Sequence, residues 1–139
     1  MIAEDLGYLT DTVKQMVADC GYPGMKVFEF AFDSRDSSGT SNYLPHNYTE
    51  NSVVYTGTHD NETMIGWLKN ILPEERQMLK DYLHYDGEDD TVLVDMSIDC
   101  IMASVSDKCI VPMQDYLGLG QEARMNFPST TGNNWKWRV

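Results

Sequence analysis

The segment TGTHDNET, residues 56–63, gathers a histidine, two carboxyl groups, an amide and three hydroxyls into eight positions directly after the apolar run Ser52–Tyr55. His59 and Asp60, side by side, can donate to and accept from sugar hydroxyls, and the same pair of side chains can bind a metal ion. They can also hydrogen-bond within their own loop. Sugar binding, metal binding and loop structure therefore all remain open for this segment.

Acidic residues also follow the other apolar runs of the chain. These runs and their acids are Met1–Ala3 with Glu4 and Asp5, Met25–Phe32 with Asp33, and Lys108–Pro112 with Asp115. A carboxylate at the end of a strand can be a general acid, a nucleophile or a metal ligand, or it can cap the following helix. Because side chains alternate along a strand, we expect Glu4 to face the interior of a site and Asp5 to cap or to make a packing hydrogen bond.

The spacing of apolar residues separates helices from strands along the chain. Apolar residues at helical spacing between Leu9 and Cys20 predict a first helix, with Thr10 as its N-cap and Gly21 as the stop. Further helices are predicted at residues 62–70, 73–84 and 91–105, and strands at residues 1–3, 25–32, 52–56 and 108–112. This order favours an α/β fold with parallel strands joined by right-handed crossovers. The carboxyl ends of such strands meet at one edge of the sheet, so TGTHDNET is expected to form one wall of a ligand site.

The composition limits the classes of partner. With 22 acidic and 10 basic residues the formal net charge is −12, which disfavours nucleic acid and anionic membranes because the electrostatic contribution would be repulsive. The three cysteines lack metal-ligand spacing and are expected to be reduced thiols, as in a cytoplasmic protein. No apolar stretch reaches the roughly 18 residues of a membrane span. A metal-dependent barrel enzyme stays an alternative, although the chain has only three histidines.

Several motifs occur together in one register along almost the whole chain. They are IAEDLG (residues 2–7), GYPGMKV (21–27), YLPHNY (43–48), YTGTHDN (55–61), PMQD (112–115) and ARMN (123–126). Together they closely resemble the C-terminal half of the 4-alpha-glucanotransferases, also called amylomaltases, of glycoside hydrolase family 77. The resemblance implies that residues 1–139 form one partial catalytic domain, the C-terminal half of a (β/α)8 barrel with strands five to eight.

The resemblance also implies roles for individual residues. Glu4 in IAEDLG matches the general acid/base, and Asp60 matches the acid that holds the sugar hydroxyls and stabilises an oxocarbenium-like transition state. His59 matches a histidine that contacts the reacting sugar, and Asn126 resembles a further substrate-contacting position. The implied reaction transfers α-1,4-glucan segments between maltooligosaccharides by a retaining double displacement, without a cofactor or a metal.

The polar loop 33–51 supplies two more candidate substrate-binding residues, Tyr43 and His46, both within YLPHNY. An aromatic ring can stack on a sugar ring, and a loop gives it little reason to pack in a core. Most of the other aromatic residues are expected to belong to the core.

The sequence departs from the family in one respect. The nucleophilic aspartate of the family lies in a motif that would precede Met1, and no such motif occurs here, so the chain resembles a piece of something longer. We therefore expect these 139 residues alone to be inactive and to self-associate through open sheet edges. A non-catalytic carbohydrate-binding half-barrel is the alternative, because it would keep His59 and the aromatic residues without needing Glu4.

Overall fold

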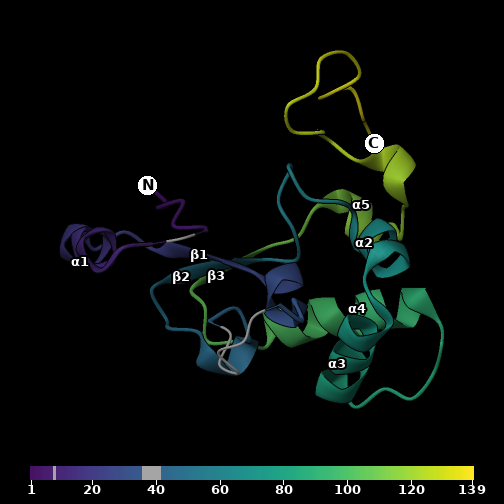
Figure 1. Ribbon diagram of the computed structural model, residues 1–139, viewed down its shortest axis with the longest axis horizontal. Coiled ribbons are helices and arrows are strands. Elements are labelled where there is room, and N and C mark those ends of the chain that lie inside the picture. The colour runs from purple at the N-terminus through teal and green to yellow at the C-terminus, as the bar shows by residue number, and fades with distance from the viewer. Residues whose placement is uncertain (8, 36–41) are drawn as a thin grey trace.

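The computed structural model describes residues 1–7, 9–35 and 42–139 and has an α/β fold (Figure 1). Its helices are α1 (Asp11–Cys20), α2 (Met64–Asn70), α3 (Pro73–Leu83), α4 (Asp90–Met102) and α5 (Met113–Tyr116), its strands are β1 (Gly24–Val27), β2 (Ser52–Tyr55) and β3 (Lys108–Ile110), and its 3-10 turns are η1 (Phe28–Phe32), η2 (Pro45–Asn47) and η3 (Gln121–Ala123). Part of the loop that includes Tyr43 and His46, residues 36–41, lies outside the described residues.

The three strands pair in parallel in the order of the sequence, which confirms the parallel arrangement predicted from the sequence. Val27, Tyr55 and Ile110 lie at the same level of the sheet, so the carboxyl ends of the strands share one edge. The predicted first strand is reduced to one isolated bridge between Ala3 and Gly24, because β1 begins at Gly24 and offers Ala3 only its first residue as a partner.

Helix α1 begins and ends as its sequence predicts. The hydroxyl of Thr10 accepts a hydrogen bond from the backbone N–H of Val13 at 3.4 Å, and Gly21 ends the helix in the left-handed region with φ of 65°. No residue of α1 is buried. Figure 1 shows α1 beside the N-terminus, apart from the other helices, so its apolar stripe contributes nothing to the core formed by the described residues.

The predicted strand 25–32 is wrong beyond Val27. Residues 28–32 form η1 instead, and this turn buries the rings of Phe28 and Phe32 with their centroids 5.1 Å apart in an edge-to-face arrangement. The backbone N–H of Glu29 donates to the carbonyl of Thr56 at 3.1 Å. Aromatic residues favour strands only where a flat sheet surface receives them, and here the helical layer receives them.

Other boundaries also differ from the prediction, most of them by one or two residues. The helix expected at 62–70 begins at Met64, because Thr63 is its N-cap and accepts from the N–H of Gly66 at 3.2 Å. The helix expected at 91–105 ends at Met102. The strand expected at 108–112 ends at Ile110, two residues before Pro112, which has no N–H to donate to a sheet.

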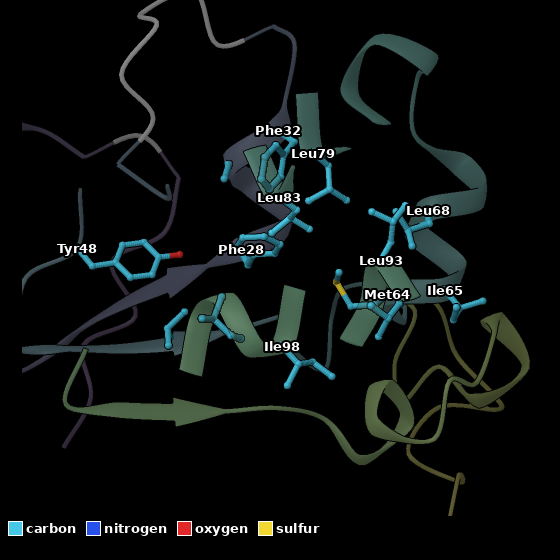
Figure 2. Close-up of a cluster of buried hydrophobic side chains, with 14 residues drawn as sticks. Phe28, Phe32, Tyr48, Met64, Ile65, Leu68, Leu79, Leu83, Leu93 and Ile98 are labelled. Atoms are coloured by element: carbon cyan, nitrogen blue, oxygen red, sulfur yellow. The ribbon is translucent and has the colours of Figure 1, made fainter. Parts of the chain in front are cut away.

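The hydrophobic core lies between η1, β2 and helices α2, α3 and α4 (Figure 2). Its most completely buried members include Met64 of α2, Leu79 of α3 and Leu93 of α4. Helix α4 contacts both α2 and α3. The core thus lies next to the residues that follow β1 and β2, and it supports the loops at the carboxyl edge of the sheet.

Glu75, at the third position of α3, connects this helical layer to the loop after η1. Its carboxylate accepts from the backbone N–H of Ser34 at 3.1 Å, from the hydroxyl of Ser34 at 2.9 Å and from the N–H of Leu72 at 3.1 Å. Burial alone would raise the pKa of Glu75, but these hydrogen bonds hold the pKa below its ordinary value. Glu75 therefore stabilises the fold in its ionised form.

We predict that Glu75→Gln lowers the free energy of unfolding by about 1–2 kcal/mol at pH 7, because the neutral amide has one acceptor oxygen instead of two and loses the charge at the helix N-terminus. Since the folded pKa is lowered, the contribution of Glu75 is present above the unfolded pKa and disappears as the pH falls through the folded pKa. Urea denaturation at pH 7 and at pH 3 measures both effects. A loss that persists unchanged at pH 3 would contradict the ionised role.

Candidate active site

The residues after β2 form a closed turn that presents His59 and Asp60. Asn61 fixes this turn, since its side-chain oxygen accepts from the backbone N–H of Thr58 at 2.9 Å and from the Thr58 hydroxyl at 2.7 Å. The N–H of Asn61 donates to the carbonyl of Thr58 at 3.1 Å. The side chains of His59 and Asp60 are left 53% and 50% exposed, so both can reach a ligand.

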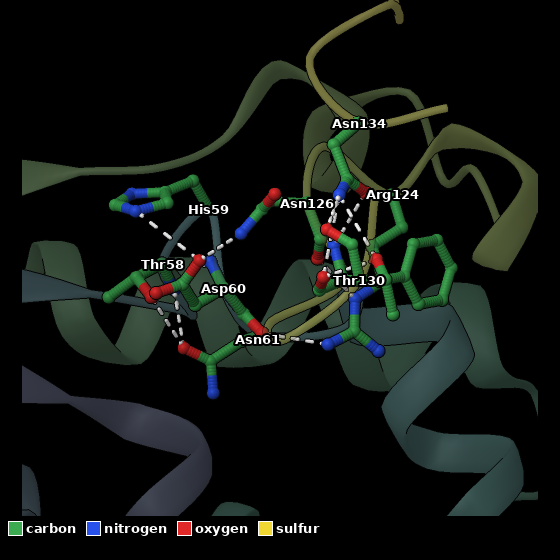
Figure 3. A network of polar contacts seen from close by, with 9 residues as sticks. Thr58, His59, Asp60, Asn61, Arg124, Asn126, Thr130 and Asn134 are labelled. Atoms are coloured by element: carbon green, nitrogen blue, oxygen red, sulfur yellow. Dashed lines mark hydrogen bonds and ion pairs between the residues drawn. The ribbon is translucent and has the colours of Figure 1, made fainter. Parts of the chain in front are cut away.

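Asp60 is held by residues from the C-terminal part of the chain (Figure 3). The side-chain amide of Asn126 donates to Asp60 Oδ1 at 2.6 Å, and the guanidinium of Arg124 donates to the Asp60 carbonyl at 2.7 Å. His59 Nε2 lies 3.4 Å from the same Oδ1. The carboxylate therefore has a fixed orientation, and three of the residues singled out in the sequence, His59, Asp60 and Asn126, lie together.

The same C-terminal segment covers His59 with an indole ring. The ring centroids of His59 and Trp135 are 4.9 Å apart. Trp135 has a φ of 62°, in the left-handed region, and its N–H donates to the carbonyl of Met125 at 2.7 Å. A bulky residue in this region is uncommon and is held there by its surroundings.

Glu4 shares a cavity with His59 and Asp60. The cavity has a volume of about 350 Å³, and its lining also includes Met25, Tyr55 and Ile110 from the three strands. Asp5 faces the other way, where its carboxylate accepts from the N–H of Met25 at 2.7 Å. The predicted separation of the two acids is confirmed: Asp5 makes a packing hydrogen bond, and Glu4 lines the cavity.

Tyr43 and His46 lie elsewhere. The imidazole of His46 stacks on the ring of Tyr82 of α3 and lies 2.9 Å from its hydroxyl. Tyr43 packs edge-on against Phe30, and its carbonyl accepts from the hydroxyl of Tyr48 at 2.6 Å. Neither residue lines the cavity of Glu4 and Asp60, so the structure does not bring them together with the other candidates.

The two acids that follow the other predicted strands, Asp33 and Asp115, have structural partners. Asp115 is buried, and its carboxylate accepts from the Thr56 hydroxyl at 2.6 Å and from the N–H of Met64 at 2.8 Å. Burial raises the pKa of Asp115, and these two hydrogen bonds partly oppose the shift. Asp33 pairs with Arg35 at 2.6 Å, and the hydrogen bond from that guanidinium lowers the pKa of Asp33.

Two residues near the site, Arg124 and Glu29, were not predicted from the sequence. Arg124 belongs to ARMN, but nothing in its spacing indicates contact with Asp60. Glu29 lies within the segment predicted as a strand, and its side chain is only 5% exposed. The sequence does contain one signal for Glu29, namely an acid between Phe28 and Phe30. A carboxyl group within an aromatic segment must either be buried or point out to solvent.

The described part of the chain contains no group of three or more histidine, cysteine or acidic side chains that could hold a metal ion. Among the same residues, no helix has both the length and the apolar character needed to cross a membrane.

We predict that Thr56→Val lowers the free energy of unfolding of the chain by about 1–3 kcal/mol, because valine has the same shape but leaves an oxygen of buried Asp115 without its donor. Equilibrium urea denaturation measures the change. The matched control is Thr12→Val on the exposed surface of α1, for which we expect a change within about 0.5 kcal/mol. Equal effects of the two substitutions would show that the hydrogen bond to Asp115 is not what stabilises the turn.

Comparison with known proteins is consistent across sequence and structure. The family model described as 4-alpha-glucanotransferase, glycoside hydrolase family 77, matches residues 1–139. The chain is 46% identical to the 4-alpha-glucanotransferase of Streptococcus pneumoniae and 45% identical to the chloroplastic/amyloplastic 4-alpha-glucanotransferase of Arabidopsis thaliana. In both comparisons all of this chain is matched, but it spans only 27% and 23% of the two relatives.

A solved structure of similar fold is the amylomaltase from Streptococcus agalactiae in complex with acarbose. It superposes with a TM-score of 0.89 at 40% identity, covering 99% of this chain and 27% of that enzyme. On these matches, together with the cavity of Glu4, His59 and Asp60, the chain belongs to the 4-alpha-glucanotransferase family, glycoside hydrolase family 77.

Proposed function

We propose that this chain supplies part of the active site of a 4-alpha-glucanotransferase that moves α-1,4-glucan segments between maltooligosaccharides. The observation that most supports the proposal is the single cavity lined by Glu4, His59 and Asp60. In (β/α) barrel enzymes, the catalytic groups usually lie in such a cavity at the carboxyl ends of the strands. The name of the Streptococcus agalactiae relative, an amylomaltase in complex with acarbose, agrees with a carbohydrate ligand.

The proposed reaction is a retaining double displacement. Glu4 protonates the glycosidic oxygen while a carboxylate nucleophile forms a glycosyl-enzyme intermediate. Glu4 then takes the proton from the hydroxyl of an acceptor sugar, which attacks the intermediate and completes the transfer. The proposal assigns the nucleophile to a part of the enzyme outside these 139 residues, since the chain spans about a quarter of its relatives.

Asp60 has the proposed role of holding sugar hydroxyls and stabilising the positive charge that develops on the reacting sugar. The fixed carboxylate, oriented by Asn126 at 2.6 Å, suits this role, because a preorganised charge stabilises a transition state without having to reorient. His59 is proposed to hydrogen-bond the same sugar, and Asn126 to contact the substrate. Tyr43 and His46 stay predictions, as substrate-binding residues at a distance from this cavity.

We further propose that the chain contributes strands five to eight of a (β/α)8 barrel, and that β1, β2 and β3 are three consecutive strands among them. Their parallel pairing in sequence order is the arrangement that a barrel requires. The proposal needs no cofactor. It retains the cytoplasm as the compartment, with which the three unpaired cysteines agree.

A non-catalytic carbohydrate-binding role is the second candidate. The ring of Trp135 beside His59 favours it, since it offers an aromatic surface to a sugar regardless of Glu4. The two candidates differ in what they require of Glu4.

We predict that the completed enzyme, in which this chain follows the preceding part of the Streptococcus pneumoniae relative, converts maltotriose into glucose and longer oligosaccharides. Glu4→Gln should lower this turnover by about 10³-fold or more while maltooligosaccharide binding is kept, because only proton transfer is lost. Product chromatography measures turnover, and calorimetry measures binding.

The control for this prediction is the 139-residue chain alone, for which we expect no transfer. Unchanged turnover in the Glu4→Gln enzyme would remove Glu4 from the mechanism. Binding without turnover in the unsubstituted completed enzyme would favour the carbohydrate-binding role.

We also predict that the chain by itself self-associates. All residues of β3 are exposed, and Ile110 lies on the same sheet face as the cavity, so the chain offers an unpaired edge next to apolar surface. Sedimentation velocity should show dimers or larger species that Ile110→Lys reduces, whereas Val139→Lys at the exposed terminus should not. A monodisperse monomer over the whole concentration range would contradict the prediction.

A further inference from the structure

Glu29 lies directly beneath the turn that presents His59 and Asp60. Its backbone N–H donates to the carbonyl of Thr56 at 3.1 Å, which attaches η1 to the start of the turn. A Cβ atom added to Gly57 would lie 3.0 Å from Glu29 Oε1 and 3.2 Å from the Cβ of Asn61. The carboxyl group of Glu29 therefore lies close against Gly57, on the side where a larger residue would carry its Cβ atom, and Asn61, the residue that closes the turn, borders the same space.

The surroundings of Glu29 do not suit a negative charge. The side chain is 5% exposed, and Oε1 has no hydrogen-bond partner in the described part of the chain. An ionised carboxylate buried in this way costs several kcal/mol unless a cation pairs with it. Asp115 of α5 and Glu62, two residues before α2, both repel a charge at Glu29.

Arg124 is the cation that faces Glu29, and it is already engaged. Its guanidinium donates to the carbonyl of Asp60 at 2.7 Å and to that of Asn126 at 2.9 Å, and it lies 3.7 Å from Glu62. Burial first, and then Asp115 and Glu62, raise the pKa of Glu29 well above 4.5, while Arg124 and a hydrogen bond with Asn61 oppose the shift.

The remaining charged groups lie on the cavity of about 380 Å³ beyond Glu29. They are Asp33, Arg35, Asp60 and Glu75. Asp33 and Arg35 pair with each other, and Glu75 is saturated by hydrogen bonds from Ser34 and Leu72. None of these groups supplies a cation that is free to pair with Glu29.

We propose that Glu29 is a positioning residue of the site, whose uncharged carboxyl group fills the space beneath Gly57 and holds the turn that presents His59 and Asp60. The catalytic part of this inference rests on the proposed function, whereas the positioning of the turn does not. Glutamine has nearly the same size and no charge, so it can replace Glu29 in this role. Alanine leaves the space empty.

The first test measures stability of the 139-residue chain against pH. Because the folded pKa of Glu29 is raised, its contribution is fully present below the ordinary value of 4.5 and is lost as the pH rises toward the folded pKa. Glu29→Gln should therefore raise the urea midpoint at pH 8, with a smaller difference at pH 5. The matched control, Glu75→Gln, should lower the midpoint at pH 8, since Glu75 acts as an anion. A fall in the midpoint at pH 8 for Glu29→Gln would overturn the uncharged state.

The second test follows the turn itself, without any activity. The backbone N–H of Thr58 is bonded within the turn, so its hydrogen exchange reports how firmly the turn is held. Glu29→Ala should speed this exchange by about tenfold or more, whereas Glu29→Gln and the control Glu75→Gln should leave it within about threefold of the unsubstituted chain. If the alanine variant does not fold, the exchange of Thr58 is compared between the unsubstituted chain and Glu29→Gln at pH 9. The unsubstituted chain should then exchange faster, because only its residue 29 can become charged. Equal exchange in all of these comparisons would overturn the positioning role.

The third test uses the completed enzyme. Glu29→Gln should keep kcat within about threefold at pH 7 and should retain more activity than the unsubstituted enzyme at pH 9, whereas Glu29→Ala should lower kcat by about tenfold or more with a smaller change in KM. A loss of about 10²-fold in the glutamine variant at pH 7 would overturn the proposal, since it would require a proton or a charge at Glu29. If the unsubstituted enzyme transfers no glucan, the proposed function fails, and the exchange of Thr58 still decides whether Glu29 holds the turn.

Discussion

A single buried carboxylate fixes both ends of the turn on which the candidate site depends. Asp115 accepts from the Thr56 hydroxyl at 2.6 Å and from the N–H of Met64 at 2.8 Å. Thr56 directly follows β2, and Met64 begins α2, so the seven residues between them, 57–63, are held at both ends by one side chain. Both oxygens are satisfied by donors, which makes the burial of this acid tolerable. Without Asp115 the turn would lose the one side chain that bonds both the residue before it and the first residue of α2.

From this anchor the site is completed by the last part of the chain. Asn126 and Arg124 reach Asp60 across 66 and 64 positions of sequence, and Trp135 covers His59. The charged groups that act on Glu29 are two further acids, Asp115 and Glu62, and one arginine, Arg124. Burial first, and then these two neighbouring acids, raise the pKa of Glu29 well above its ordinary value.

Local signals predicted the pieces of structure that depend on near neighbours. Thr10 and Gly21 delimit α1 because capping needs only the adjacent backbone. Pro73 begins α3 for a similar reason, since a missing N–H costs nothing at a helix start. The segment Phe28–Phe32 shows the limit of such reasoning. Its aromatic residues predict a strand, but their rings pack against helices that come later in the chain. The backbone conformation that buries these rings is η1.

For the site, the sequence by itself determined which residues lie at the ends of strands. The alternation of side chains directs Glu4 and Asp5 to opposite faces, and the motif at residues 56–63 places His59 and Asp60 side by side after β2. Only the tertiary structure decided that Asn126 and Arg124 hold Asp60, that His46 stacks on Tyr82 away from the cavity, and that Glu29 is buried under Gly57. The physical reason is that periodicity and capping act over a few residues, whereas burial and hydrogen bonding between distant segments exist only once the chain has closed around its core.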